Sequence, residues 1–117
     1  MAAKDTLGKR GEERALVYLQ DRGYRLIDRN WRCRQGEIDL IVERDGQTVF
    51  VEVKTRTSTA FGHPFEAITP AKLARLRRLV AAWCSHSGRP TTRVRIDAVA
   101  VTGTDDAAVV EHLLGIN

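Results

Sequence analysis

The sequence is poor in the residues that build zinc sites, disulfide frameworks and membrane spans. It has two cysteines, Cys33 and Cys84, among 117 residues, and neither belongs to a Cys-x-x-Cys pair or stands at ligand spacing from a histidine. This pattern argues against zinc and predicts reduced thiols. No apolar run approaches membrane-spanning length, and the N-terminus lacks the apolar core of a signal peptide. We therefore expect a soluble, cytoplasmic protein with no membrane partner.

Charge, by contrast, is plentiful. Charged residues make up 29% of the chain and hydrophobic residues 43%, with a formal net charge of +4. The length fits one domain over residues 1–117, and the apolar content suffices for one modest core. The basic excess favours a polyanionic partner, although ordinary solubility charge explains it equally well.

The spacing of apolar residues predicts the order of helices and strands. The expected elements are a helix from about Thr6 to Arg22, a strand over Tyr24–Asn30, a hairpin over Gly36–Thr55, a helix from Thr69-Pro70 to Gly88, a strand over Arg93–Val101 and a short last strand within Ala107–Leu114. The passage through the second helix should be a right-handed crossover, which makes the strands on either side of it parallel. We therefore expect an α/β fold in which helices flank a mixed sheet.

The hairpin carries a strong turn signal. Asp45-Gly46 between two apolar runs is typical of a two-residue type I′ turn. With that turn, Arg44 pairs with Gln47, and the register of every other cross-strand pair follows from this one. The turn therefore fixes which side chains face each other along the hairpin.

That register places Asp39 opposite Glu52, and Glu37 opposite Lys54, on one face of the sheet. Opposed carboxylates repel, and burying them without a partner is costly, so a counter-charge is expected. A divalent metal is the simplest candidate, and oxygen ligands suit Mg²⁺ or Mn²⁺. Such a cation activates water, and Lys54 can position or deprotonate that water, which is the chemistry of phosphodiester hydrolysis. The alternative for Glu37 and Lys54 is a plain cross-strand ion pair.

The first helix offers a third carboxylate. Glu12 stands three residues before Ala15 and four before Leu16, so it shares the apolar face that points at the sheet. Glu13 is rotated toward solvent. We expect Glu12 to project toward the same site, with a solvated helix residue as the alternative.

Several sequence blocks resemble a known family. They are Gly8–Glu12, Arg29-Asn30, Gly36–Ile41, Val51–Arg56 and Arg95–Asp97. Asp39 followed by Glu52-Val53-Lys54 resembles the D…(D/E)-x-K signature of the PD-(D/E)XK nuclease superfamily, although Ile38 stands where the literal signature has proline. The expected element order resembles the superfamily's restriction-endonuclease-like αβββαβ core. Over roughly residues 6 to 101 the chain resembles the YraN family, whose members are described as endonuclease-like and similar to archaeal Holliday-junction resolvases.

The resemblance implies a metal-dependent endonuclease that cuts DNA, with structured or branched DNA among the expected substrates. It assigns Asp39, Glu52 and Glu12 to the Mg²⁺ or Mn²⁺ and Lys54 to the attacking water. Glu37 would either add to the metal shell or hold Lys54 in place. The alternatives are a non-catalytic nucleic-acid-binding module that keeps the fold, and an interaction scaffold without affinity for nucleic acid. Cutting two strands needs two sites, so a homodimer is compatible with this interpretation.

Basic residues are spaced for contacts with a phosphate backbone. Lys72, Arg75 and Arg78 recur at three-residue steps along the second helix, and Arg56 follows Lys54 by two positions. We expect all four to contact nucleic acid, with a solvated helix face as the ordinary alternative for the helical three. Further arginines near the first strand can add to the same field: Arg25, Arg29, Arg32 and Arg34.

The histidines are scattered along the chain. His63 follows the hairpin and is expected to border the site, whereas His86 and His112 are expected at the surface. Asp97 is expected either to be structural or to form an ion pair with a basic residue near the site.

Overall fold

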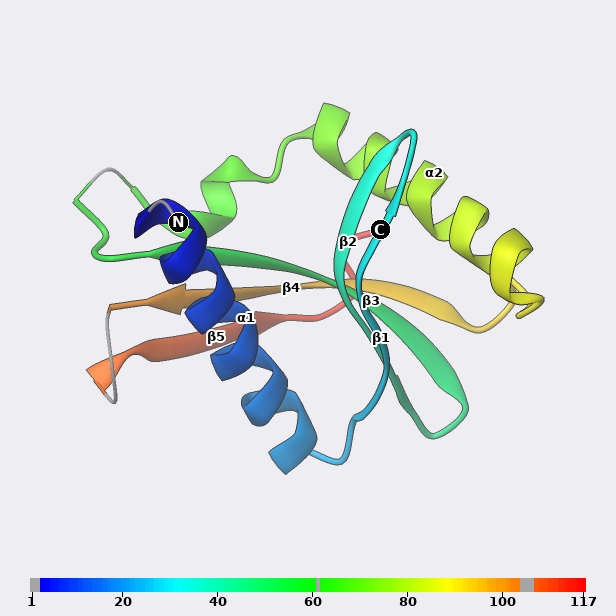
Figure 1. Cartoon of the computed structure of the whole chain (residues 1–117), viewed down its shortest axis with the longest axis horizontal. Coiled ribbons are helices and arrows are strands. Elements are labelled where there is room, and N and C mark those ends of the chain that lie inside the picture. Colours follow the sequence, from blue (N-terminus) through cyan, green and yellow to red (C-terminus); the bar gives the residue numbers. More distant parts are fainter. Residues whose placement is uncertain (1–2, 61, 104–106) are drawn as a thin grey trace.

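The structure, a computed structural model, describes residues 3–60, 62–103 and 107–117 and shows a mixed sheet between two α-helices (Figure 1). The elements are α1 (Ala3–Asp21), β1 (Arg25–Cys33), β2 (Gly36–Arg44), β3 (Gln47–Arg56), the short 3-10 helix η1 (Pro64–Ala67), α2 (Pro70–Ser87), β4 (Val94–Thr102) and β5 (Val109–Leu113). The sheet order is β1-β2-β3-β4-β5. Strands β3 and β4 are parallel, and the other neighbours are antiparallel. This confirms the predicted α/β fold, its αβββαβ order and the last short strand.

The structure confirms the predicted start and end of α2 and the predicted end of α1. Thr69 caps α2, its Oγ1 accepting the Lys72 N–H at 3.2 Å, and Pro70 opens the helix. At the other end Gly88 adopts a left-handed φ of 79°, as Gly23 does after α1 with a φ of 87°. In the described part of the chain, none of the helices is long and apolar enough to cross a membrane.

The two helices cover opposite faces of the sheet, and each face has its own core. The core under α1 contains Ala15, Leu16 and Leu19 of the helix with Leu40, Val42, Val49, Val51, Val99 and Val101 of the strands. The core under α2 contains Leu76, Leu79, Val80 and Trp83 with Ile41, Phe50 and Ile96. Burial on both faces explains why the central strands are almost continuously apolar.

The hairpin turn confirms the predicted register over most of its length. Asp45 and Gly46 both have positive φ, 53° and 77°, as a type I′ turn requires. The ladder runs from Arg44–Gln47 to Leu40–Val51 and ends there. The predicted opposition of Asp39 with Glu52 and of Glu37 with Lys54 is therefore wrong as a pairing of ladder residues.

The reason is that β2 leaves β3 and follows β1. Strand β1 extends past its predicted end at Asn30 and pairs with β2 as far as Cys33–Gly36. Figure 1 shows this β1–β2 hairpin rising beside α2, away from β3. At the point of separation the Asp39 carboxylate takes the place of a strand partner, its Oδ2 accepting the Val53 N–H at 2.8 Å.

Candidate active site

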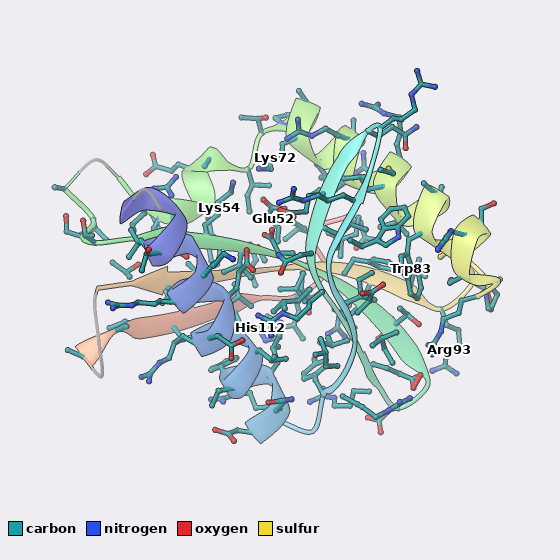
Figure 2. All side chains as sticks on the ribbon, viewed as in Figure 1. Glu52, Lys54, Lys72, Trp83, Arg93 and His112 are labelled. Atoms are coloured by element: carbon teal, nitrogen blue, oxygen red, sulfur yellow. The ribbon has the colours of Figure 1, made fainter. Side chains whose placement is uncertain are left out.

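A cavity of about 390 Å³ opens where β2 and β3 part, beside the first turns of α2. It is lined by Gly36, Glu37, Asp39, Glu52, Val53, Lys54, Lys72, Arg75, Leu76 and Leu79. The structure thus brings together the acids and the lysine that the hairpin pattern singled out, although the strands no longer pair there. Figure 2 shows Glu52, Lys54 and Lys72 in the region between β3 and the start of α2.

The charged form of the Asp39 side chain is disfavoured at this position. Burial, and next the charge of Glu52, raise the pKa of its carboxyl to about 7, against the lowering effect of the Val53 N–H. A carboxylate whose ionisation is opposed in this way is stabilised by any cation placed next to it. The geometry therefore favours a cation between these two acids.

Glu52 is buried and already has cationic partners. Its Oε1 lies 2.9 Å from Lys72 Nζ and 3.2 Å from Lys54 Nζ. Burial lowers the pKa of Lys54, and the neighbouring Lys72 lowers it further, so Lys54 gives up a proton more readily than an exposed lysine. The counter-charge that the sequence assigned to a metal is thus supplied here by two lysines.

The contact between Lys72 and Glu52 is the main feature that sequence reasoning missed. Lys72 was expected to line a phosphate-binding ridge with Arg75 and Arg78 rather than to touch an acid. A signal was present, since Lys72 stands four residues before the buried Leu76 on the same helix. Residues at this spacing share a helix face, which turns Lys72 toward the sheet.

Glu37 lies in the cavity but is held by a different partner from the one expected. Its Oε2 accepts a hydrogen bond from Arg32 Nε at 2.7 Å. Arg32 comes from β1, whose pairing with β2 carries Glu37 away from Lys54. The simple cross-strand ion pair between Glu37 and Lys54 is therefore replaced by one between neighbours of the β1–β2 hairpin.

Glu12 lies near the cavity without lining it in the described part of the chain. Its Oε1 accepts a hydrogen bond from Asn30 Nδ2 at 2.9 Å. Its charge also raises the pKa of Asp39, an effect smaller than those of burial and of Glu52. Glu12 is therefore close enough to influence the acid pair, and its role as a ligand stays a prediction.

The remaining predicted residues divide between the cavity and the surface. Arg75 joins Lys72 in the lining, whereas Arg56 and Arg78 are exposed and lie outside the cavity, among the residues described. His63, expected beside the site, caps η1, and its Nε2 lies 2.8 Å from Glu111 Oε1 on β5. The cavity therefore has a cationic wall on α2, facing the acids on the strands.

The donor set fits a hard cation. Within the described ranges no three His, Cys, Asp or Glu side chains group as a ready-made metal site. Of the three acids in the cavity, Glu37 is paired with Arg32, which leaves Asp39 and Glu52 as donors. Mg²⁺ often takes only one or two carboxylates and fills its other positions with water and substrate phosphate. Two oxygen donors, one of which has its pKa raised to about 7 by burial and next by the other's charge, match that requirement.

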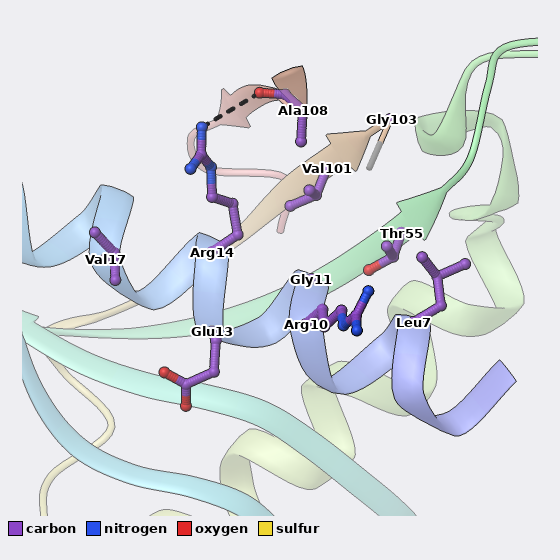
Figure 3. A pocket seen from close by; sticks show the side chains of 10 residues that line it. All are labelled: Leu7, Arg10, Gly11, Glu13, Arg14, Val17, Thr55, Val101, Gly103 and Ala108. Carbon is purple, nitrogen blue, oxygen red and sulfur yellow. Dashed lines mark hydrogen bonds between the residues drawn. The ribbon is translucent and has the colours of Figure 1, made fainter. Parts of the chain in front are cut away.

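A second cavity, of about 290 Å³, lies on the α1 side of β3 (Figure 3). Gly11 brings α1 against Thr55 here, since a Cβ at Gly11 would lie 1.9 Å from Thr55 Oγ1. Among the described residues of the lining, the one acid is Glu13, which is paired with Arg29 at 2.7 Å. In its described lining this mostly apolar cavity has no acid pair like that of the first one, and the close packing at Gly11 explains how α1 is seated beside the site.

A buried polar network lies farther along the α1 face, and it corrects one expectation. His112, expected at the surface, has a side chain only 6% exposed, and its Nε2 lies 2.7 Å from Asp97 Oδ2. Asp97 is also bound by Arg95 and by the Gly115 N–H. The surface assignment failed because β5 pairs with β4 and turns His112 inward against Tyr18 and Tyr24. Asp97 is therefore structural, one of the two roles expected for it.

Comparisons with known proteins place this chain among bacterial relatives. Residues 11–101 match the model of a family described as "Uncharacterised protein family UPF0102". A UPF0102 protein of Arthrobacter sp. (strain FB24) is 55% identical over 120 residues, covering 99% of each chain. One from Leifsonia xyli is 54% identical over 117 residues, again covering 99% of each. The chain is also similar in structure to a repair endonuclease from Pyrococcus abyssi, with 23% identity and a TM-score of 0.48, over 80% of this chain and 38% of that one.

Proposed function

This chain belongs to the UPF0102 (YraN) family, and we propose that it is a metal-dependent endonuclease that hydrolyses phosphodiester bonds in DNA. The observation that supports this most is the pair Asp39 and Glu52, which share one cavity in which burial and the charge of Glu52 raise the pKa of Asp39. Lys54 and the basic side chains of α2 stand around the pair. An acid whose pKa is raised by burial and by a neighbouring charge inside a cleft is typical of functional sites rather than of structural cores.

Asp39 and Glu52 would hold Mg²⁺ or Mn²⁺, with Glu12 as a further candidate ligand close by. When bound, such an ion supplies Lewis acidity at a phosphoryl oxygen and lowers the pKa of a coordinated water. The Val53 N–H fixes the Asp39 carboxylate at the point where β2 and β3 part. The two acids are therefore held by backbone structure and not by flexible loops.

Lys54 would handle the proton of the attacking water or stabilise the charge that develops on the phosphoryl group. Its lowered pKa, caused chiefly by burial, suits the first role, and its place in the cavity suits the second. Lys72 and Arg75 would bind the scissile phosphate from the α2 side of the cavity. Arg56 and Arg78, which are exposed and lie outside the cavity lining, would contact the DNA backbone beyond the scissile phosphate.

The substrate we propose is structured or branched DNA, and two copies of the chain would be needed to cut two strands. The β1–β2 hairpin supports a contact beyond a single phosphate, because Arg32 and Arg34 lie exposed near its tip next to the cavity. A salt-dependent affinity is the signature of such contacts.

A nicking assay with branched, flap, single-stranded and duplex DNA in Mg²⁺ or Mn²⁺ tests the proposal. Wild type should cut at least one substrate, and Lys54→Ala should bind it without cutting. Lys9→Ala, which removes an exposed lysine of α1, is the control and should cut normally. Binding without cleavage of every substrate would favour a nucleic-acid-binding module instead, and neither binding nor cleavage would favour a scaffold.

A further inference from the structure

We propose that Lys72 is the counter-ion of Glu52 in the metal-free protein. Its ammonium group binds Oε1, the Glu52 oxygen that would hold the metal, until a divalent cation displaces the ammonium group. This rests on the proposed function, because it concerns the same acid pair. It adds a role for Lys72 that comes before any contact with substrate: its ammonium group competes with the metal. Metal binding would then free Lys72 for a phosphate.

The contacts at Glu52 support this. Both lysine Nζ atoms lie on one oxygen, Oε1, with Lys72 at 2.9 Å and Lys54 at 3.2 Å. The Glu52 side chain is 8% exposed, so water screens these interactions little. A carboxylate held this closely by two ammonium groups is not a vacant ligand, and an incoming cation must compete for it.

The charges indicate which way the competition acts. Asp39 and Glu52 carry two negative charges when ionised, and Lys54 and Lys72 carry two positive ones. A divalent cation on the acids leaves the cluster with an excess of two positive charges, and like charges in contact repel. At least one ammonium must then withdraw from Oε1, and the excess attracts an anion such as a phosphodiester.

Lys72 is the group placed to withdraw. Its side chain is 22% exposed, against 16% for Lys54. The backbone of its helix is fixed by the Thr69 cap and by the buried Leu76, so only the flexible lysine stem has to move. Arg75 lies one turn further on and lines the same cavity. A phosphate entering beside Arg75 would therefore meet the released ammonium group.

Calorimetry of Mn²⁺ binding at constant ionic strength tests the proposal without any need for cleavage. Lys72→Ala should bind Mn²⁺ about tenfold more tightly than wild type, a gain of about 1.4 kcal/mol, because its ammonium group no longer competes for Oε1. Lys72→Arg keeps the charge and should stay within about threefold of wild type. Arg78→Ala removes a charge from the same helix outside the cavity and should change the affinity less than twofold.

Unchanged or weaker binding by folded Lys72→Ala would overturn the role of Lys72. If that variant does not fold, Lys72→Gln keeps the stem and a polar end, and the same tightening is expected of it. Absence of Mn²⁺ binding by wild type would instead overturn the metal site and the proposed function with it. Tighter metal binding together with a raised KM for DNA would support both steps, because a structural defect would not strengthen metal binding.

Discussion

Asp97 is fully buried and Asp39 is partly buried at the wall of a cavity, and the surroundings of these two acids differ completely. Asp97 is 0% exposed, and each of its oxygens has two partners: Arg95 and Gly115 on Oδ1, Arg95 and His112 on Oδ2. Burial alone would raise the pKa of Asp97, but the bonds from His112, Arg95 and Gly115 outweigh it, and the pKa is lowered. Asp39 accepts the Val53 N–H and faces the charge of Glu52, and its pKa is raised to about 7.

Asp97 therefore stabilises the fold, whereas Asp39 is held by the fold in surroundings that disfavour its charged form. The Asp97 network joins β4 to β5 and, through Arg95, to Tyr24 at the start of β1. The Asp39 site gains little stability from its own charge. An arrangement that costs stability and opens into a cavity is expected where function requires it.

The largest expected difference between the two regions concerns activity. Glu52→Gln should slow cleavage about 1000-fold, because a lost electrostatic contact at the reacting centre costs about 4 kcal/mol. Asp97→Asn should stay within about threefold of wild type per folded molecule, since its network lies on the α1 face. Single-turnover cleavage rates on the best substrate measure the effects of both variants. An equal loss of rate in the two variants would contradict the different roles given to the two regions.

Stability should show the reverse order. Asp97→Ala should lower the free energy of unfolding by about 3–5 kcal/mol, because it leaves the partly buried Arg95 and the buried His112 without their anion. Urea denaturation at pH 7 measures this loss. A cost below about 1 kcal/mol would contradict the structural role of Asp97.

Asp39→Asn should do the opposite and stabilise the metal-free protein, by up to about 4 kcal/mol at pH 8. The folded-state pKa of about 7 lies above the ordinary value of 3.8, so the folded protein holds this proton while the unfolded chain has lost it. The resulting penalty is absent below pH 4, grows between pH 4 and 7, and is complete above pH 7. Denaturation in the presence of EDTA at pH 4 and pH 8 measures this penalty. A variant that is less stable than wild type at pH 8 would contradict the raised pKa of Asp39.

The smallest effect should come from Glu37, whose partner Arg32 is largely exposed. Glu37→Gln should change the free energy of unfolding by less than about 0.5 kcal/mol, as is usual for surface ion pairs. A rate loss as large as that of Glu52→Gln would place Glu37 among the metal ligands instead.

The sequence predicted those parts of the fold that depend on local geometry. The Asp45-Gly46 turn alone determined the register of β2 and β3, and the Thr69 and Gly88 caps determined α2. The separation of β2 from β3 could not be predicted this way, because it depends on how far β1 pairs along β2. The same limit explains His112, whose short strand shows its buried side only once β5 lies on β4.

The acids of the candidate site could be predicted from the sequence, but the contact of Lys72 with Glu52, which helps to balance their charge, could not. Asp39, Glu52 and Lys54 belong to one hairpin, so a turn and an alternation pattern bring them together. Lys72 reaches Glu52 from α2, the helix that connects β3 to β4, and so from outside the hairpin. Only the position of α2 over the sheet makes that contact, and with it the balance of charge on which metal binding depends.

The most direct test of the central claim is calorimetry of Mn²⁺ binding by wild type and Asp39→Ala at pH 8 and pH 6. Wild type should bind at pH 8 and bind more weakly at pH 6 with release of a proton, because a carboxyl with a pKa of about 7 is then mostly protonated. Asp39→Ala should show no binding at either pH. Equal binding by the two proteins, or none by wild type, would contradict a metal site at Asp39 and Glu52.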